Sequence, residues 1–193
     1  MRIATCLAAV LLGFSGPALA QPFQHSSGEW RQYNADWLSA CPGTIHEDAT
    51  DFYGYSCFSS TGSQELNDAN LPAYKLTLIH NRLDGEIDLA ITVSPAKGEY
   101  DPDRPMVLRF GGEGPLVLTM GTDMETRHNT INQFFLIGAD RDAVLAKMRE
   151  RNALTLSVPL VGVDKPVESR LSLRGVLASL DFMSTYARRV AQY

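Results

Sequence analysis

DWLSAC at residues 36–41 and YGYSCF at residues 53–58 are the two stretches around which the chain is organised. The first contains Trp37 and the second Tyr53, Tyr55 and Phe58, aromatic residues of the kind enriched in β-strands, and each stretch contains one cysteine. We therefore expect two neighbouring strands that a disulfide can join. Whether Cys41 and Cys57 form that disulfide depends on the compartment in which the protein folds.

The first twenty residues indicate export. A single basic residue, Arg2, precedes an apolar run at residues 3–14, and residues 18–20 read Ala-Leu-Ala. This order is typical of a secretory signal peptide. A membrane anchor is the alternative, but a bilayer-spanning helix needs about 20 apolar residues. Gln21 stands where a lipoprotein would carry a cysteine. We expect cleavage after Ala20 and a periplasmic or secreted protein.

Export decides how the cysteines are interpreted. Only Cys41 and Cys57 remain after cleavage, and a pair of cysteines in an exported chain usually forms a disulfide. A redox-active pair would favour the close Cys-x-x-Cys spacing, which is absent here. The sequence therefore predicts a structural bridge, and closing a loop of about 15 residues contributes roughly 3 kcal/mol in the chain-entropy model.

Composition narrows the classes of partner. The chain has 22 acidic and 17 basic side chains and a formal net charge of −5, which argues against nucleic acid and anionic membranes as partners. Residues 21–193 have a suitable length for one domain. No second apolar run is long enough to span a membrane, so we expect no transmembrane segment after cleavage.

Hydrophobic alternation predicts a mainly β protein. In residues 87–93, Ile, Leu, Ile and Val alternate with smaller or polar residues, which is the period of a strand with one buried face. Two helices are expected late in the chain, at residues 140–151 with Asp140 as the cap and at residues 175–190. Because helices do not separate the strands, the order favours a β-sandwich. Strands are expected at residues 28–41, 52–58, 74–80, 87–93, 106–110, 116–120, 132–137, 154–161 and 167–173, with a long loop at 59–72.

With these segments placed, the chain resembles the invasion-associated locus B family of exported bacterial proteins. The similar features are Asp-Trp shortly before Cys41, the second cysteine at Cys57, the paired strands in residues 105–120, and the closing segment 171–180. The resemblance implies an immunoglobulin-like β-sandwich with one or two short helices near the C-terminus. It also implies a periplasmic or surface location and no established enzymatic activity.

The chain departs from that family at two points. Members often have a further cysteine pair before the late helix, whereas residues 120–140 contain no cysteine. Val176 also stands where the family usually has an aromatic residue. These differences indicate a divergent relative or another family with a similar sandwich.

The residues with potential chemistry favour structural roles. The four histidines have no metal-ligand spacing, so no metal site is predicted. Glu99, Asp101 and Asp103 offer oxygens to a cation, but Pro102 interrupts them, and a solvated loop is the default with calcium as the alternative. Residues 111–114 lack the Lys-Ser/Thr of a phosphate loop and suit a tight turn. Glu168 and Arg170, two positions apart on an expected strand, face the same side and are expected to form a solvated ion pair. We identify no catalytic residue and no cofactor site.

The aromatic residues are the strongest candidates for recognition. Packing around the disulfide is the simpler interpretation, with Trp37 inside, whereas an exposed aromatic patch would bind a partner. The cluster is centred on Trp30, Trp37, Tyr53 and Tyr55 and also includes Tyr33, Phe52 and Phe58.

Two functions remain open from the sequence. The first is a non-catalytic binding or envelope-interaction module with an unknown protein or envelope partner. The second is a small periplasmic hydrolase or ligand carrier. An exposed apolar patch would favour the module, and an enclosed pocket with perturbed ionisable groups would favour the hydrolase or carrier.

Overall fold

The computed structural model describes residues 21–43, 56–81, 85–127 and 130–190. The expected signal peptide, residues 1–20, lies outside this part of the chain, as do Tyr53 and Tyr55 of the expected aromatic cluster. Within the described residues, no helix is both long and apolar enough to cross a membrane.

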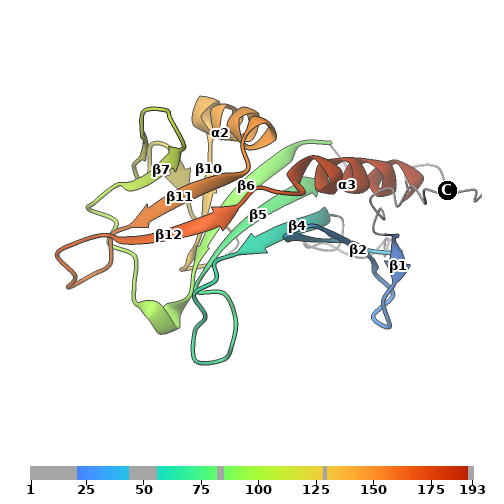
Figure 1. Cartoon of the computed structure of the whole chain (residues 1–193), viewed down its shortest axis with the longest axis horizontal. Coiled ribbons are helices and arrows are strands. Elements are labelled where there is room, and N and C mark those ends of the chain that lie inside the picture. Colours follow the sequence, from blue (N-terminus) through green and yellow to red (C-terminus); the bar gives the residue numbers. More distant parts are fainter. Residues whose placement is uncertain (1–20, 44–55, 82–84, 128–129, 191–193) are drawn as a thin grey trace, which may run out of the picture.

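In the described part of the chain, the larger of two antiparallel sheets contains eight strands (Figure 1). Its order is β1-β2-β3-β4-β5-β6-β10-β9, so the first six strands are neighbours in both sequence and space. Each of these six strands pairs antiparallel with the next one along the chain, which makes a meander. The strands are β1 (Phe23–Gln24), β2 (Trp30–Asn34), β3 (Trp37–Cys41), β4 (Ser56–Gly62), β5 (Tyr74–Asn81), β6 (Ile87–Val93), β9 (Met124–Glu125) and β10 (Gln133–Leu136).

The smaller sheet has the order β12-β11-β7-β8. Side chains from both sheets share one hydrophobic core, which includes Leu76 and Leu89 of the large sheet and Leu108 and Leu156 of the small one. The four strands are β7 (Met106–Phe110), β8 (Leu116–Leu118), β11 (Ala153–Val158) and β12 (Val167–Ser172). The expected β-sandwich-like, mainly β fold is confirmed.

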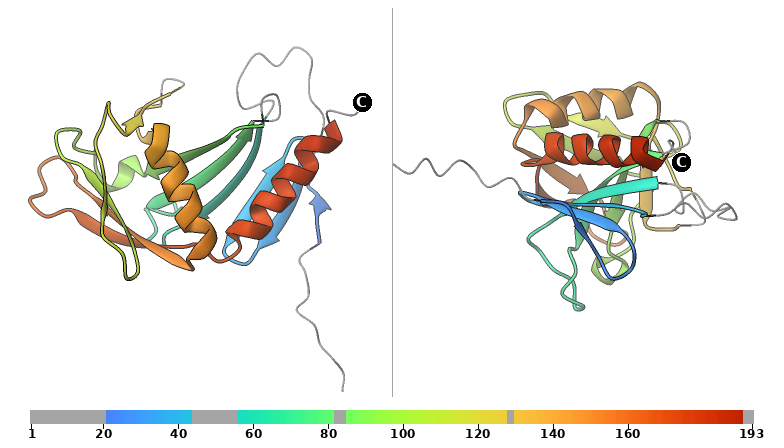
Figure 2. Two further views of the ribbon diagram at one scale, coloured as in Figure 1. Left: turned by 90° about the horizontal axis from the view of Figure 1, so that it is seen from above. Right: turned by 90° about the vertical axis from the view of Figure 1, so that its right-hand side faces the viewer.

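Two helices complete the cover of the large sheet (Figure 2). Helix α3 (Val176–Val190) contacts β2, β3, β4 and β5, while α2 (Gly138–Glu150) contacts α3 and β6. A single helical turn, η1 (Pro95–Lys97), follows β6. The inner face of the large sheet is therefore covered partly by the small sheet and partly by α3.

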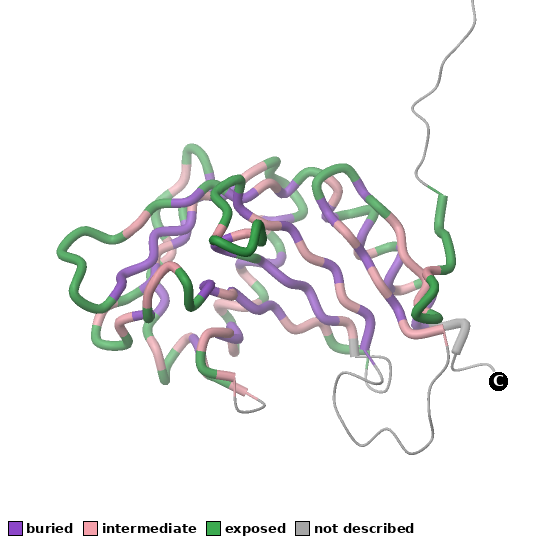
Figure 3. The backbone as a smooth tube through the Cα atoms, turned by 90° about the horizontal axis from the view of Figure 1, so that it is seen from below, coloured by how far each residue is buried: buried purple, intermediate pink, exposed green. Residues whose placement is uncertain are grey.

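Successive side chains of the large sheet point to opposite faces, and Figure 3 shows the burial of each residue along the strands. In the middle of β5 both faces are buried, because Ile79 also packs in a small second cluster with Ala90 and Phe135. Tyr74, Leu76 and Leu78 of β5 point into the core. Their neighbour Lys75 lies opposite Thr92 of β6 on the other face, called here the outer face. This is the period-two pattern expected for residues 74–80 and 87–93.

Two predicted segments differ in the structure. Residues 28–41 form a hairpin of β2 and β3 rather than one strand, with Ala35 in a left-handed conformation (φ 51°) at the turn. Residues 59–62 belong to β4 rather than to a loop. Neither segment carries a strong signal, because the hairpin turn contains no glycine or proline and the β4 end is rich in serine.

Two local assignments were also wrong. Helix α2 begins at Gly138, with Ile137 as its cap residue, so Asp140 lies in the first turn instead of capping it. An acidic residue there still interacts favourably with the helix dipole. Glu168 forms an ion pair across the sheet with Arg109 at 2.9 Å and not the expected pair with Arg170.

Candidate binding surface

The turn of the β2–β3 hairpin is fixed against the segment that links β12 to α3. The Asp36 amide donates to the carbonyl oxygen of Arg174 at 3.3 Å, and the Trp37 indole N–H donates to that of Ser172 at 3.1 Å. The Ser172 hydroxyl donates to the Asp36 carboxylate at 2.6 Å. Three hydrogen bonds therefore join segments that are far apart in the sequence.

Gly175 allows this close approach. Its φ of 102° is in the region that favours glycine, and a Cβ at this position would overlap the carbonyl oxygen of Asn34. The next residue, Val176, is buried at the start of α3. The Gly175–Val176 step thus sets the distance between α3 and the hairpin.

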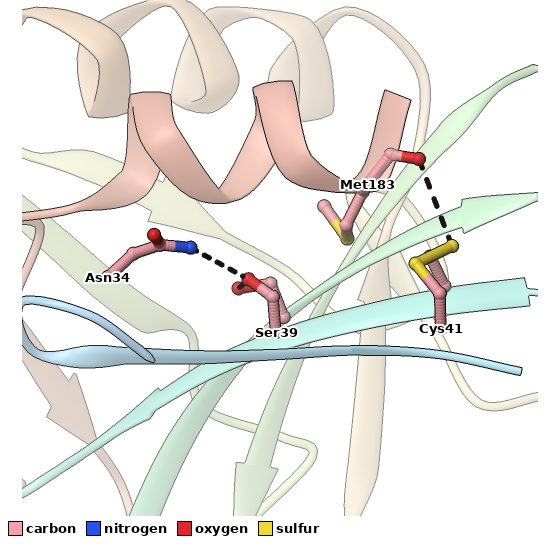
Figure 4. Close-up of a disulfide and its surroundings, with 6 residues drawn as sticks. Asn34, Ser39, Cys41 and Met183 are labelled. Atoms are coloured by element: carbon pink, nitrogen blue, oxygen red, sulfur yellow. Dashed lines mark hydrogen bonds between the residues drawn. A yellow bond between two sulfur atoms is a disulfide. The ribbon is translucent and has the colours of Figure 1, made fainter. Parts of the chain in front are cut away.

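A buried chain of polar side chains continues beneath α3 (Figure 4). The Asn34 side-chain amide donates to the hydroxyls of Ser39 and Ser179, each at 3.2 Å. The Ser39 hydroxyl is also 2.9 Å from that of Ser59. Buried polar groups are costly unless they are hydrogen-bonded, so these contacts specify how α3 sits on β2, β3 and β4.

The other end of the hairpin contains the Cys41–Cys57 disulfide that the sequence predicts. Both cysteines are fully buried, and the Cys57 sulfur lies 3.8 Å from the carbonyl oxygen of Met183 in α3 (Figure 4). A disulfide sulfur has no proton, so this is a packing contact. Complete burial favours a structural role over redox exchange.

The aromatic residues near the disulfide are divided between the two faces. Trp37 is 1% exposed, as expected, and Trp30 packs on Tyr186 of α3 with ring centroids 5.5 Å apart. Tyr33 instead projects from the outer face, is 57% exposed, and stacks on Phe23. The set therefore contributes both to the core and to an exposed aromatic surface.

An apolar depression of about 670 Å³, here named the outer cleft, lies on the outer face of the large sheet. Its floor includes Leu38 and Ser60, which are directly paired between β3 and β4. Tyr33 and Leu71 at its margin are 57% and 59% exposed. Apolar side chains left in solvent around a concavity are typical of a binding surface.

A second, more polar depression of about 840 Å³ lies at the seam between the two sheets and is here named the seam cleft. One wall comes from β12 and the segment after it, and the other from the end of β4 and the residues that follow. The two clefts share Asp36, Thr61 and Gly62. The hairpin turn therefore separates an apolar cleft from a polar one.

Some charged groups of the seam cleft already have a partner within the protein, and others could still bind a ligand. Asp36 accepts the Ser172 hydroxyl, Glu168 pairs with Arg109, and Glu65 pairs with Lys97 at 2.9 Å. By contrast, Arg170 and Arg174 are exposed, and within the described residues neither guanidinium group forms an ion pair or a hydrogen bond. The charged groups that remain available to a ligand in the seam cleft are therefore mainly positive, although the whole chain is acidic.

Shifted ionisable groups lie elsewhere. Burial, aided by the Asp101 carboxylate, raises the pKa of Tyr100 to about 12, and the Tyr100 hydroxyl donates to the carbonyl oxygen of Arg104 at 3.0 Å. Burial also raises the pKa of Tyr74 in the core. Neither tyrosine lines the outer cleft or the seam cleft.

The other predicted motifs have structural roles. The Asp101 carboxylate accepts from Arg104 at 2.7 Å and from the Asp103 amide at 3.1 Å, so it stabilises its own loop. No group of three His, Cys, Asp or Glu residues suited to a metal occurs in the part of the chain described here. Residues 111–114 form the turn between β7 and β8, in which Glu113 pairs with Lys147 of α2 and with Arg151, which follows the helix.

Sequence reasoning did not find most of the cleft residues. Tyr33 belonged to the expected aromatic set, but Leu71 was assigned to an ordinary loop and Arg170 to an ion pair. Of the residues that line the outer cleft, Tyr33 and Trp37 had a signal as members of the aromatic set. The other residues had none, because the clefts combine segments from both halves of the chain. Their convergence depends on topology, which short-range patterns do not encode.

Comparison with known proteins gives a structural match. No protein-family model and no curated protein matches the sequence. The fold, however, is similar to a solved one. It is that of invasion associated protein B from Bartonella henselae, with a TM-score of 0.55 over 82% of this chain and 98% of the other. The sequences are 17% identical, so the similarity concerns the fold.

Proposed function

We propose that this protein is an exported, non-catalytic binding module that recognises a protein partner at the cell envelope or at a host surface. The observation that carries the proposal is the outer cleft, where Tyr33 and Leu71 remain exposed beside a concave apolar floor. Tyrosine is enriched among residues that dominate binding energy, and a rigid sheet presents it at little entropic cost.

Three further elements belong to the proposal. Residues 1–20 act as a cleaved signal peptide, residues 21–193 form one domain, and the mature protein is periplasmic or secreted. A buried disulfide fits an oxidising compartment. The similarity to invasion associated protein B supports membership in the invasion-associated locus B family.

The hydrolase or carrier receives less support from the geometry. It would favour an enclosed pocket in which several ionisable groups have shifted pKa values. In the described residues, Tyr100 with its raised pKa lines a cavity of about 270 Å³, together with apolar neighbours such as Ile131 and Phe134. Its hydroxyl is already used by the Arg104 carbonyl oxygen.

Intact-mass measurement of the exported protein tests its processing. A mass that begins at Gln21, with two cysteines alkylated only after reduction, is the expected result. A mass that includes residues 1–20, or free thiols before reduction, would contradict export by cleavage or the structural disulfide.

Site-specific photo-crosslinking tests the binding surface. A benzophenone side chain replaces Tyr33 or Leu71 at the outer cleft, and Val117 provides the control because it is 52% exposed on β8 and does not line the cleft. In exporting cells, discrete protein adducts are expected from the two cleft positions and not from Val117. Equal or absent adducts at all three positions would overturn the proposal.

A further inference from the structure

The seam cleft lies between two strand edges. In the described residues β12 is the outermost strand of the small sheet, and Glu168, Ser169, Arg170 and Ser172 from it line the cleft. On the opposite side lie Thr61 and Gly62, beyond the residues at which β4 pairs with β3. Since consecutive strand residues form both walls, the cleft has the shape for a segment of polypeptide.

Two of the five described basic side chains that form no ion pair line the seam cleft. Most described lysine and arginine side chains form ion pairs, such as Arg109 with Glu168 and Arg127 with Asp88. Two of the exceptions, Arg170 and Arg174, line the seam cleft, and Lys75 lines the outer cleft. The remaining described exceptions are Arg149 and Lys165, which line neither cleft.

The acidic residues of the seam cleft do not fully neutralise these arginines. Glu65 and Glu168 each form an ion pair with a basic residue that does not line the cleft, Lys97 and Arg109. The Asp36 carboxylate keeps its charge while it accepts the Ser172 hydroxyl, so two arginines face one remaining carboxylate. A guanidinium group presents several donors in a planar fork that matches a carboxylate. The chemistry that complements the cleft is therefore a carboxylate.

We propose that the seam cleft binds an acidic segment of the partner protein, with carboxylates on Arg170 and Arg174. An apolar side chain of the same segment then reaches the outer cleft, because both clefts meet at Asp36, Thr61 and Gly62. This inference rests on the proposed protein-binding function and adds the charge of the partner. The local arginines determine specificity although the whole chain has a net charge of −5.

Peptide selection provides the test. Short random peptides are displayed and selected against the full exported protein, and the most enriched peptide is synthesised for affinity measurement. The test variant is R170E/R174E, and the matched control is R149E/K165E, which changes net charge equally at exposed sites outside both clefts. Circular dichroism and thermal unfolding establish that both variants fold.

Enriched peptides are expected to contain more Asp and Glu than the input library. Their affinity should fall at least about tenfold in R170E/R174E and change by less than about twofold in R149E/K165E, because only the first pair places like charges against the ligand. Higher salt should weaken wild-type binding, since exposed charges are screened.

The alternative outcomes separate this inference from the proposed function. If Tyr33→Ser abolishes peptide binding while R170E/R174E does not, the acidic-segment inference fails and the binding module stands. If neither variant changes binding, or no peptide is enriched, both fail. Binding to phosphatidylglycerol vesicles without peptide enrichment would assign the arginines to an anionic lipid surface and overturn the inference.

Discussion

The two ends of the β2–β3 hairpin are held in different ways. At one end, a disulfide joins Cys41 to Cys57, two residues separated by 16 positions. At the other, hydrogen bonds and the close approach of Gly175 join the turn to residues more than a hundred positions away. The binding clefts meet at this second, non-covalent end.

We expect the two ends of the hairpin to contribute differently to stability and to ligand recognition. A disulfide acts mainly by restricting the unfolded chain, whereas buried hydrogen bonds and steric fit define one native arrangement. We therefore expect changes at the disulfide end to lower stability without altering the clefts. Changes at the turn end should affect both.

The largest expected effect is that of Gly175→Ala. A Cβ would overlap the Asn34 carbonyl oxygen in a backbone region that disfavours side chains, so we expect a loss of roughly 3–5 kcal/mol in the free energy of unfolding. Urea unfolding measures this loss. Gly114→Ala is the control, because open space surrounds Gly114, and it should change stability by less than about 1 kcal/mol.

Removing the disulfide should have the next largest effect. Replacing Cys41 and Cys57 with serine is expected to lower the free energy of unfolding by about 3 kcal/mol, because the unfolded chain regains the entropy of the opened loop. Urea unfolding with and without reductant measures the change. At temperatures where the double variant stays folded, peptide affinity should match the wild type, and a weaker affinity would contradict the proposed separation.

Asn34→Ala tests the buried polar chain. Without the amide, the hydroxyls of Ser39 and Ser179 lose a buried donor, and we expect a loss of about 1–3 kcal/mol. A double-mutant cycle with Ser179→Ala should show coupling, since the two side chains share one hydrogen bond. Additive losses would mean that the two residues act independently.

Ser172→Ala should have the smallest effect. It removes the hydroxyl that donates to the Asp36 carboxylate near the surface, for an expected loss of about 1 kcal/mol or less. Thermal unfolding measures the stability. The freed carboxylate should also weaken binding of an acidic peptide, and unchanged affinity would argue against a role of Asp36 in tuning the cleft.

Local patterns predicted the features that depend on local chemistry. Alternating residues in β5 and β6 indicated their buried faces, and the cysteine pair indicated the disulfide. The hairpin turn at Ala35 was missed because no glycine or proline marks it, although Ala35 adopts a positive φ. The clefts were missed because each is lined by segments that lie far apart in the sequence. Leu71 and Arg170 become part of a cleft only when the sheets are assembled.

The position of Gly175 also has a consequence for the order of synthesis and export. The disulfide lies in the first third of the chain, whereas Ser172 and Arg174, which line the seam cleft, follow it by more than a hundred positions. A nascent chain can therefore acquire its covalent bond long before it can recognise a ligand. The seam cleft is complete only when the segment after β12 is present, so products truncated before Ser172 should not bind an acidic ligand there.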